Sequence, residues 1–236
     1  MLKRREQVCA LLLCCAALML LAASCGESTK TRESDTDDAA SNARVKRGVK
    51  PEPDAEAAVI ETELGRIVIE LYPNIAPKMV ERFKQLTREG FYNGTTFHRI
   101  NPSTGVVQGG DPNSKDDNPA NDGMGDSPYP DVEAEFSDIP FDTGIVGAAR
   151  QGERPAMAGL PAISEEQAYN TANCQFYITT RRVPGWDQQY TVFGRVIEGM
   201  NNVGVIAGAP VREGTERPDP AIVIQRITLQ PRASFK

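Results

Sequence analysis

The sequence has few of the side chains on which most catalytic centres depend. Its 236 residues include one histidine, His98, and aromatic residues make up 6% of the chain. A lone histidine excludes metal sites built from several imidazoles, and any serine–histidine–aspartate triad would have to be centred on it. The 26 basic residues are outnumbered by 32 acidic ones, which argues against binding to nucleic-acid phosphates. We therefore expect no nucleic-acid partner, no metal and no cofactor.

Cysteine is almost absent from the body of the chain. Four of the five cysteines lie within the first 25 residues, and only Cys174 follows. The main domain therefore has no internal disulfide, although an exported protein could form one.

The first 24 residues predict a secretory signal peptide. Three basic residues precede an apolar run, Val8–Ala23, which is shorter than the ~20 residues of a membrane-spanning helix. The sequence from Leu21 to Cys25 resembles a bacterial lipobox, although Ala22 stands where leucine is usual. Two outcomes remain open. Cys25 is lipidated and anchors the domain to a bacterial membrane, facing the periplasm or the exterior, or the chain is cleaved after Ala23 or Ser24 and released.

The segment that follows, residues 25–56, is polar and nearly free of large apolar side chains. Such a segment buries too little surface to offset the entropy lost on ordering, so it predicts a disordered tether. One domain, residues 57–230, and a short tail, residues 231–236, complete the chain.

Residues 57–230 predict a mainly β domain with two helices. The 20 glycines and 17 prolines indicate many turns. A hairpin over residues 59–72 precedes a helix from Pro77 to Glu89, in which Met79, Phe83 and Leu86 form a buried stripe; a second helix is expected at Met200–Ile206. Short strands are expected around residues 96–100, 106–109, 144–149, 175–179, 191–196 and 222–229. This pattern favours a closed antiparallel barrel with helices capping its ends.

Five short motifs occur in order along this domain. They are Phe97-His98-Arg99-Ile100, Val107-Gln108-Gly109-Gly110-Asp111, Gln175-Phe176-Tyr177-Ile178-Thr179, Val192-Phe193-Gly194-Arg195-Val196 and Glu198-Gly199-Met200. With these motifs the domain resembles the cyclophilins, which are peptidyl-prolyl cis-trans isomerases, in their bacterial exported lipoprotein form. The resemblance implies a closed eight-stranded antiparallel barrel with two capping helices. It also implies an isomerase that acts on proline-containing polypeptides during the folding of exported proteins, and we expect a monomer.

The resemblance assigns the chemistry to a guanidinium. Rotation about an Xaa-Pro bond meets a barrier of ~20 kcal/mol set by amide resonance, and no nucleophile is required to lower it. Arg99 matches the family's catalytic arginine; outside this motif a surface ion pair would be its default role. Gln108 and Gln175 match the amides that hold the arginine and the substrate backbone. Strand alternation would place Phe97 with Arg99 on one face and His98, as a packed structural histidine, on the other.

The predicted proline slot departs from the family pattern. By resemblance the remaining substrate-binding positions are Val106, Ala149, Arg150, Tyr177, Trp186 and Tyr190. The loop from Arg99 to Gln108 is one residue longer than usual, and Gly105 stands where the family carries an aromatic residue. We therefore expect one wall of the proline slot to offer little apolar surface. Gly105→Phe would restore that surface, unless the Trp186 ring turns into the space of the missing aromatic side chain. Phe176, which points away from Gln175 and Tyr177, is expected in the core.

Two loops leave alternatives open. Residues 151–173 form a longer segment than the family's usual loop, and they either extend the substrate surface or cover it. The acidic residues between Asp111 and Asp126 fail the spacing of a helix-loop-helix calcium site, which favours a solvated loop. A second function also remains open, because the loss of the aromatic at Gly105 suits a catalytically weak, proline-peptide-binding scaffold or chaperone of the cell envelope.

Overall fold

The computed structural model describes residues 45–157 and 159–235. The predicted signal peptide and Cys25 lie outside these residues. Within the described ranges, no helix combines the length and the apolar character needed to cross a lipid bilayer.

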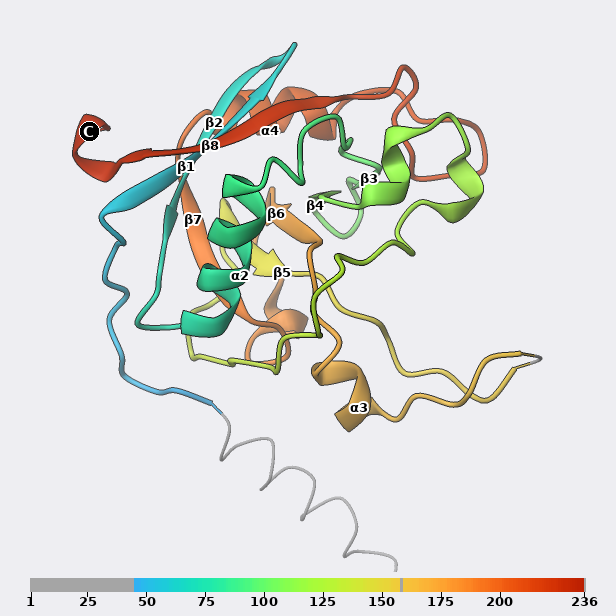
Figure 1. Cartoon of the computed structure of the whole chain (residues 1–236), viewed down its shortest axis with the longest axis horizontal. Helices are drawn as coiled ribbons and strands as arrows, with labels where there is room; N and C mark the ends of the chain where they lie inside the picture. Colours follow the sequence, from blue (N-terminus) through green and yellow to red (C-terminus); the bar gives the residue numbers. More distant parts are fainter. Residues whose placement is uncertain (1–44, 158, 236) are drawn as a thin grey trace, which may run out of the picture. The chain divides into compact units, whose positions relative to one another are not determined.

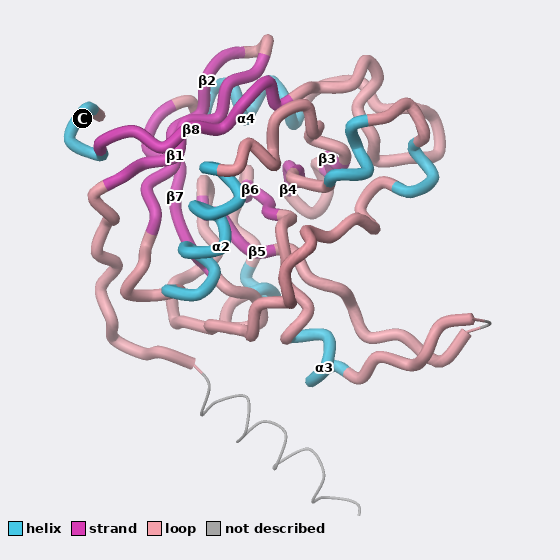
Figure 2. Tube along the Cα trace, in the orientation of Figure 1, coloured by secondary structure: helices cyan, strands magenta, loops and turns pink. Residues whose placement is uncertain are grey.

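Among the described residues, eight strands form one curled antiparallel sheet (Figures 1 and 2). The strands are β1 (Glu56–Thr62), β2 (Gly65–Leu71), β3 (Arg99–Asn101), β4 (Val106–Gly109), β5 (Ile145–Ala148), β6 (Phe176–Thr179), β7 (Val192–Glu198) and β8 (Ile224–Pro231). Their spatial order is β3-β4-β6-β5-β7-β2-β1-β8. The prediction of a mainly β, antiparallel fold is confirmed.

The two edge strands of this sheet, β3 and β8, approach each other without forming a ladder. Backbone hydrogen bonds connect the segments around their starts: Gly94 N donates to Ile224 O at 2.9 Å, and Phe97 N donates to Ile222 O at 2.9 Å. Ile224 N donates in return to Thr95 O at 2.7 Å. The sheet is therefore a curled half-barrel whose edges are linked through the loop that precedes β3.

Three helices accompany the sheet in the described part of the chain: α2 (Pro77–Arg88), α3 (Glu165–Tyr169) and α4 (Met200–Ala207). Pro77 is the first residue of α2, where a backbone N–H would have no partner within the helix, so proline fits there without losing a hydrogen bond. The helix buries Met79, Val80, Phe83 and Leu86. The sequence predicted α2 and α4. It missed α3, which begins in a capping box formed by Ser164 and Gln167.

A group of aromatic rings packs together within the mainly aliphatic core. Phe176 meets Phe83 edge-on with centroids 5.5 Å apart, and Tyr92 at 5.8 Å. Phe97 also lies in this core, 6.4 Å from Phe176 and fully buried. The core position expected for Phe176 is therefore observed.

The expected alternation of Phe97, His98 and Arg99 is wrong. Strand β3 begins only at Arg99, so the two-residue period does not extend back to Phe97. Phe97 points into the core while Arg99 is half-buried at the surface. His98, 5% exposed, lines the same cavity of about 610 Å³ as Arg99.

The end of the predicted tether is packed against the domain. Lys46 N donates to Phe136 O at 2.9 Å, and its ammonium donates to Ile75 O at 2.7 Å. Asp54 accepts two hydrogen bonds from the Lys84 ammonium of α2, at 2.9 and 2.8 Å. Disorder is thus the wrong prediction for residues 45–56, because backbone hydrogen bonds and partly buried ion pairs to α2 hold this segment in place.

The acidic loop is less solvated than expected. Asp111 is fully buried, and its carboxylate accepts hydrogen bonds from the backbone of Asn113 and Gly123. Asp122 pairs with Arg217 at 2.7 Å, and both side chains are less than 10% exposed. The solvated interpretation is therefore wrong for these two aspartates, which bind the loop's own backbone and a neighbouring loop.

Candidate active site

The sheet register aligns the polar residues that the sequence selected. Arg99 on β3 lies directly opposite Gln108 on β4, and Gln108 lies opposite Tyr177 on β6. Tyr177 is in turn opposite Gly147 on β5. Side chains of directly paired residues point to the same side of a sheet, so Arg99, Gln108 and Tyr177 form one row across three strands.

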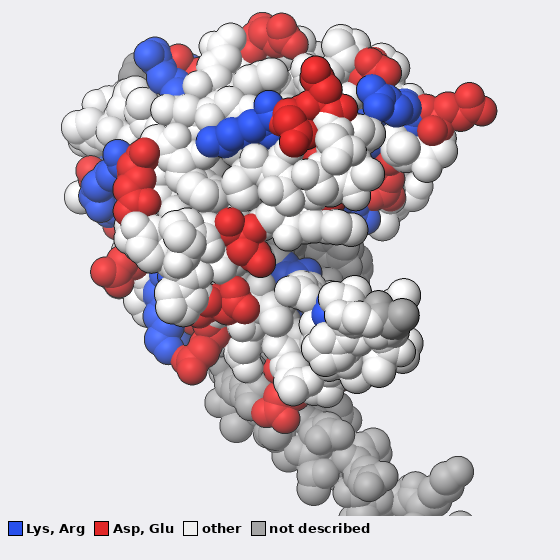
Figure 3. All heavy atoms as spheres, turned by 45° about the vertical axis from the view of Figure 1, so that its right-hand side comes forward, with Lys and Arg blue, Asp and Glu red and all other residues white. Residues whose placement is uncertain are grey.

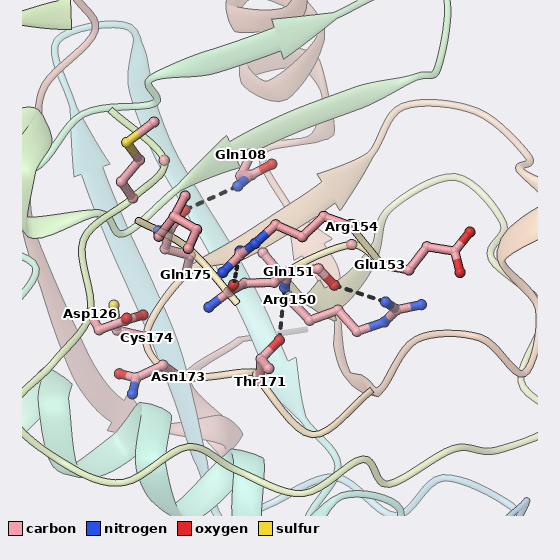
Figure 4. Close-up of a pocket in the computed structure, with 15 residues that line it drawn as sticks. Gln108, Asp126, Arg150, Gln151, Glu153, Arg154, Thr171, Asn173, Cys174 and Gln175 are labelled. Atoms are coloured by element: carbon pink, nitrogen blue, oxygen red, sulfur yellow. Dashed lines mark hydrogen bonds between the residues drawn. The ribbon is translucent and has the colours of Figure 1, made fainter. Parts of the chain in front are cut away.

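A chain of hydrogen bonds fixes the guanidinium and the two amides. Arg99 Nη1 donates to Gln108 Oε1 at 3.3 Å. Gln108 Nε2 donates in turn to Gln175 Oε1 at 3.1 Å (Figure 4). Gln175 Nε2 donates to Gly125 O at 2.9 Å. Each amide therefore has one orientation, with its oxygen towards Arg99. The structure brings together all three residues that the motifs selected.

Arg99 has a further partner that the sequence did not reveal. Its Nε donates to a carboxylate oxygen of Glu216, from the loop between α4 and β8, and the other oxygen of Glu216 accepts from Asn101 Nδ2. More than a hundred residues separate Glu216 from Arg99 along the chain. Glu216 belongs to none of the motifs, so no sequence signal pointed to it.

The predicted slot residues pack as an aromatic cluster. Tyr177 lies 5.1 Å from Trp186 and 5.8 Å from Tyr190, and the Trp186 and Tyr190 rings are 5.2 Å apart. Val106 and the fully buried Phe141 belong to the same cluster, Phe141 being a member that the sequence analysis missed. Val106 and Tyr177 are only 1% and 3% exposed, whereas Trp186 and Tyr190 are half-buried. The apolar surface open to a ligand therefore belongs mainly to Trp186 and Tyr190.

Gly105 cannot carry the aromatic side chain found in the family. Its φ is +76°, in the left-handed region that favours glycine, and a Cβ there would lie 2.5 Å from Arg181 Cγ. The 101–105 turn is closed by a hydrogen bond from Gly105 N to Asn101 O at 2.8 Å. The positive φ and the approach to Arg181 argue against the expected benefit of Gly105→Phe, which stays a prediction to be measured.

Arg150 is held between two aromatic rings. Its guanidinium carbon lies 4.7 Å from the centroid of Tyr169 on α3 and 4.4 Å from that of Tyr190. Its Nε and Nη2 donate to Gln189 O at 3.4 and 3.3 Å. The neighbouring Ala149 N donates to Gln175 O at 3.0 Å. The segment 149–150 is thus fixed beside the two glutamines, and α3 contributes directly to its position.

A second cavity, also of about 610 Å³ and distinct from the one that His98 and Arg99 line, adjoins this row of residues. Gln108 and Gln175 line it together with Ala149 and Arg150, and Arg154 and Leu160 also belong to its lining. Arg154 and Leu160 come from a hairpin in which Arg154 pairs with Ile163 and Met157 with Leu160. This hairpin projects from the body of the molecule (Figures 1 and 2), and Figure 3 shows a hollow beside it with basic side chains inside. Residues 151–173 therefore extend the surface next to the site and do not cover it.

Burial shifts the pKa values of the groups nearest the site away from neutrality. Desolvation lowers the pKa of His98 to about 4, partly opposed by the Asp111 carboxylate. Burial also raises the pKa of the Cys174 thiol to about 12 and that of the Tyr177 phenol well above its usual value. None of these three residues is suited to proton transfer near pH 7, whereas Arg99 presents a fixed positive charge.

Known proteins resemble this chain in sequence and in fold. The model of the cyclophilin-type peptidyl-prolyl cis-trans isomerases matches residues 57–229. A probable peptidyl-prolyl cis-trans isomerase of Brucella suis is 38% identical over 168 residues, which are 70% of this chain and 75% of that protein. The mouse peptidylprolyl isomerase domain and WD repeat-containing protein 1 is 33% identical over 210 residues, 86% of this chain and 29% of that one.

Solved structures agree with this relationship. A cyclophilin-type isomerase from Cryptosporidium parvum has a TM-score of 0.60 and 27% identity, covering 74% of this chain and 97% of that one. The same comparison with a structure determined in the presence of the dipeptide Ala-Pro gives a TM-score of 0.60 at 24% identity, covering 74% of this chain and 98% of that chain. The match over residues 57–229 and the identity to the Brucella protein together show that this chain belongs to the cyclophilin-type peptidyl-prolyl cis-trans isomerases.

Proposed function

We propose that the Arg99 guanidinium catalyses the isomerisation, and the hydrogen-bonded line Arg99–Gln108–Gln175 is the observation that carries this proposal. In the planar Xaa-Pro amide the nitrogen lone pair is delocalised, and this resonance sets the ~20 kcal/mol barrier. As the bond twists, the lone pair localises on the prolyl nitrogen and can accept a hydrogen bond. A guanidinium directed at that nitrogen therefore binds the twisted amide more strongly than the planar one, without any covalent step.

The residues around Arg99 supply the substrate contacts in this proposal. The exposed faces of Trp186 and Tyr190 bind the prolyl ring, above the buried floor of Val106 and Tyr177. Gln108 acts with Arg99, and Gln175, Ala149 and Arg150 bind the substrate backbone beside the cavity. These roles follow from position. Arg99, Gln108 and Gln175 form one hydrogen-bonded row, and the apolar cluster next to it contains Val106, Ala149, Tyr177, Trp186 and Tyr190. Arg150 stacks on the Tyr190 ring of that cluster.

The direct test is isomerisation of an Ala-Pro-containing peptide followed by exchange NMR. Wild type should accelerate cis–trans exchange catalytically, and Arg99→Ala should abolish the acceleration while the peptide still binds. If wild type binds the peptide without accelerating exchange, the scaffold function takes its place. If Arg99→Ala stays active, catalysis does not depend on this guanidinium.

We further propose that the protein is an exported, lipid-anchored monomer that assists the folding of other exported proteins. The support is the basic and apolar N-terminus ending at Cys25, followed by a polar segment up to residue 44. From residue 45 onward the chain contacts the domain, so a tether of about 20 residues would separate the lipid from the folded body.

Cys25→Ser tests the anchor. Wild type should partition with membranes and require detergent for extraction, and the serine variant should appear in the soluble exported fraction. A serine variant that still partitions fully with membranes would show that the chain is attached in another way.

The last element of the proposal is that the sheet is closed in solution. The bonds of Gly94 and Phe97 to residues near the start of β8 support this. In a closed barrel these two amides should exchange with deuterium as slowly as those in the middle of β1. Rapid exchange at both amides would leave the sheet open.

A further inference from the structure

Glu216 is the one acidic side chain that the described structure places on the Arg99 guanidinium. Its carboxylate accepts a hydrogen bond from Arg99 Nε with one oxygen and from Asn101 Nδ2 with the other. Gln108 already accepts from Arg99 Nη1. The Arg99 guanidinium is therefore held by two hydrogen bonds, one to the Glu216 carboxylate and one to the Gln108 amide, and together they fix the orientation of its plane.

Backbone contacts show that Glu216 is held in place independently of Arg99. Ile100 N of β3 donates to Glu216 O at 2.8 Å, which attaches this loop to the strand that carries Arg99. Asn101 Oδ1 accepts from Thr104 N at 2.9 Å, so the side chain that orients the Glu216 carboxylate also shapes the β3–β4 turn. The carboxylate thus has a fixed direction before any substrate binds.

The residue after Glu216 anchors the same loop on its other side. Arg217 pairs with Asp122 at 2.7 Å, with side chains 9% and 8% exposed. Its Nη2 donates to Asp116 O at 3.3 Å. Gly125, three residues beyond Asp122, accepts from Gln175. The contacts therefore form a closed circuit from Glu216 through Arg99, the two glutamines and the acidic loop back to Arg217.

We propose that Glu216 is a positioning residue that fixes the Arg99 guanidinium through its Nε, so that the remaining N–H groups face the substrate. An arginine side chain has several rotatable bonds and loses conformational freedom when its planar head is held, so a preformed carboxylate contact reduces the reorganisation needed to reach the transition state. The inference rests on the proposed catalytic role of Arg99. Glu216 itself touches no reacting atom.

The test compares Glu216→Ala and Glu216→Asp with Glu216→Gln. Alanine removes the acceptor, and aspartate keeps the charge but shortens the side chain by one methylene, so both should lower kcat by roughly tenfold or more with KM within twofold of wild type. Glutamine keeps an oxygen that can accept from Nε, and it should restore kcat to within about threefold. Glu213→Ala is the matched control, because Glu213 is an exposed glutamate of the same loop, and it should leave both constants unchanged.

An NMR signature separates positioning from simple support of the fold. The Arg99 Nε–H resonance should be slow to exchange with water in wild type and in Glu216→Gln, and it should broaden in the alanine and aspartate variants. A Glu216→Ala protein with wild-type kcat overturns the inference whatever its melting temperature. A raised kcat/KM in this variant also overturns it, because Glu216 would then lower the activity of the wild-type enzyme. Arg99→Ala is measured alongside: if it is inactive while Glu216→Ala is normal, only the inference fails, and if it is active the proposed role of Arg99 fails.

Discussion

At the scale of single residues, Arg99 does more than carry a positive charge. Two of its nitrogens are already engaged, Nε by Glu216 and Nη1 by Gln108, and this leaves the rest of the planar group for the substrate. A carboxylate and an amide can hold one guanidinium at two edges because its donors lie in a rigid plane. A lysine ammonium is a point donor on a flexible stem and cannot keep both contacts while also reaching the substrate.

Arg99→Lys should therefore lower kcat/KM by about a hundredfold, similar to the loss of one preorganised donor in other active sites. The measurement is exchange NMR on an Ala-Pro peptide at several enzyme concentrations. Arg195→Lys on β7, at an exposed position, is the control and should match wild type. Activity of Arg99→Lys within about twofold of wild type would mean that charge alone is sufficient.

Trp186 is the second residue whose role is set by geometry. It packs edge-on against Tyr177, with ring centroids 5.1 Å apart. Aromatic contacts of this kind are worth about 0.5–1.5 kcal/mol beyond the burial of apolar surface. The ring thus replaces apolar surface that the 101–105 turn cannot provide.

Trp186→Leu should lower kcat/KM by about tenfold, because a prolyl ring would lose its aromatic surface. Trp186→Phe should retain most of the activity. Gly105→Phe, in contrast, should lower the melting temperature without raising kcat/KM, since a side chain at φ +76° would also collide with Arg181. A faster Gly105→Phe enzyme would show that the turn rearranges to admit the ring.

At the scale of elements, the short helix α3 links the 151–173 segment to the site. Tyr169 at its end covers one face of the Arg150 guanidinium. The single hydroxyl proton of Tyr169 lies between two acceptors, Glu165 Oε1 at 2.6 Å and Gln189 Oε1 at 2.8 Å. The capping box at Ser164 begins the helix and so fixes where Tyr169 falls. The extra length of this segment therefore positions a residue of the substrate surface.

Tyr169→Leu should raise KM about threefold to tenfold with kcat within twofold, because Arg150 would lose one ring of a cation–π pair worth about 0.5–2 kcal/mol. Tyr169→Phe keeps the ring and is the matched control, with KM expected within twofold of wild type. Steady-state kinetics on one peptide series decides between them. Equal KM values for all three proteins would show that Arg150 does not depend on α3.

The elements that sequence periodicity predicts are the ones with a regular apolar pattern. Helices α2 and α4 and all eight strands were expected near their observed positions. The apolar residues of these elements recur at the spacing of a helix or a strand, and this spacing can be read from neighbouring residues alone. The face predicted for Phe97 was wrong because β3 begins only at Arg99, two residues after Phe97. Pairing with β4 sets this start, and the local sequence does not show it. Helix α3 was missed because five residues are too few to show a helical period.

The same distinction applies to the site. Arg99, Gln108 and Gln175 were found because each lies inside a motif. Glu216 and Phe141 were missed because their positions depend on tertiary folding: a single acid in a loop and a single buried phenylalanine have no local pattern. The turn at Gly105 could be counted as one residue longer, but only its φ shows that a side chain is excluded.

At the scale of the whole molecule, several ionisable groups are buried around the site. His98, Asp122 and Arg217 line the same cavity as Arg99, and all three are largely buried. Asp111, which is fully buried, acts on His98 through its charge. Asp122 is held by Arg217, although burial raises the pKa of this carboxyl. Burial lowers the pKa of His98 to about 4 in the folded protein, so in mildly acidic solution His98 is neutral when folded and protonated when unfolded.

This burial predicts how stability depends on pH. The pKa of His98 is about 4 in the folded protein against 6.5 as its usual value, so the unfolded chain binds the additional proton between these two pH values. The free energy of unfolding should therefore be highest above pH 6.5 and fall as the pH decreases towards 4, with a contribution from His98 of roughly 3 kcal/mol. His98→Gln should lack this component, and urea unfolding of both proteins at pH 7, 5.5 and 4.5 measures the difference, in which the shared carboxylates largely cancel.

Because neutral His98 does not titrate above pH 6, kcat/KM should be flat between about pH 6 and 8.5. Parallel stability curves for the two proteins, or a bell-shaped activity profile that His98→Gln abolishes, would show that the pKa of His98 in the folded protein is close to its usual value.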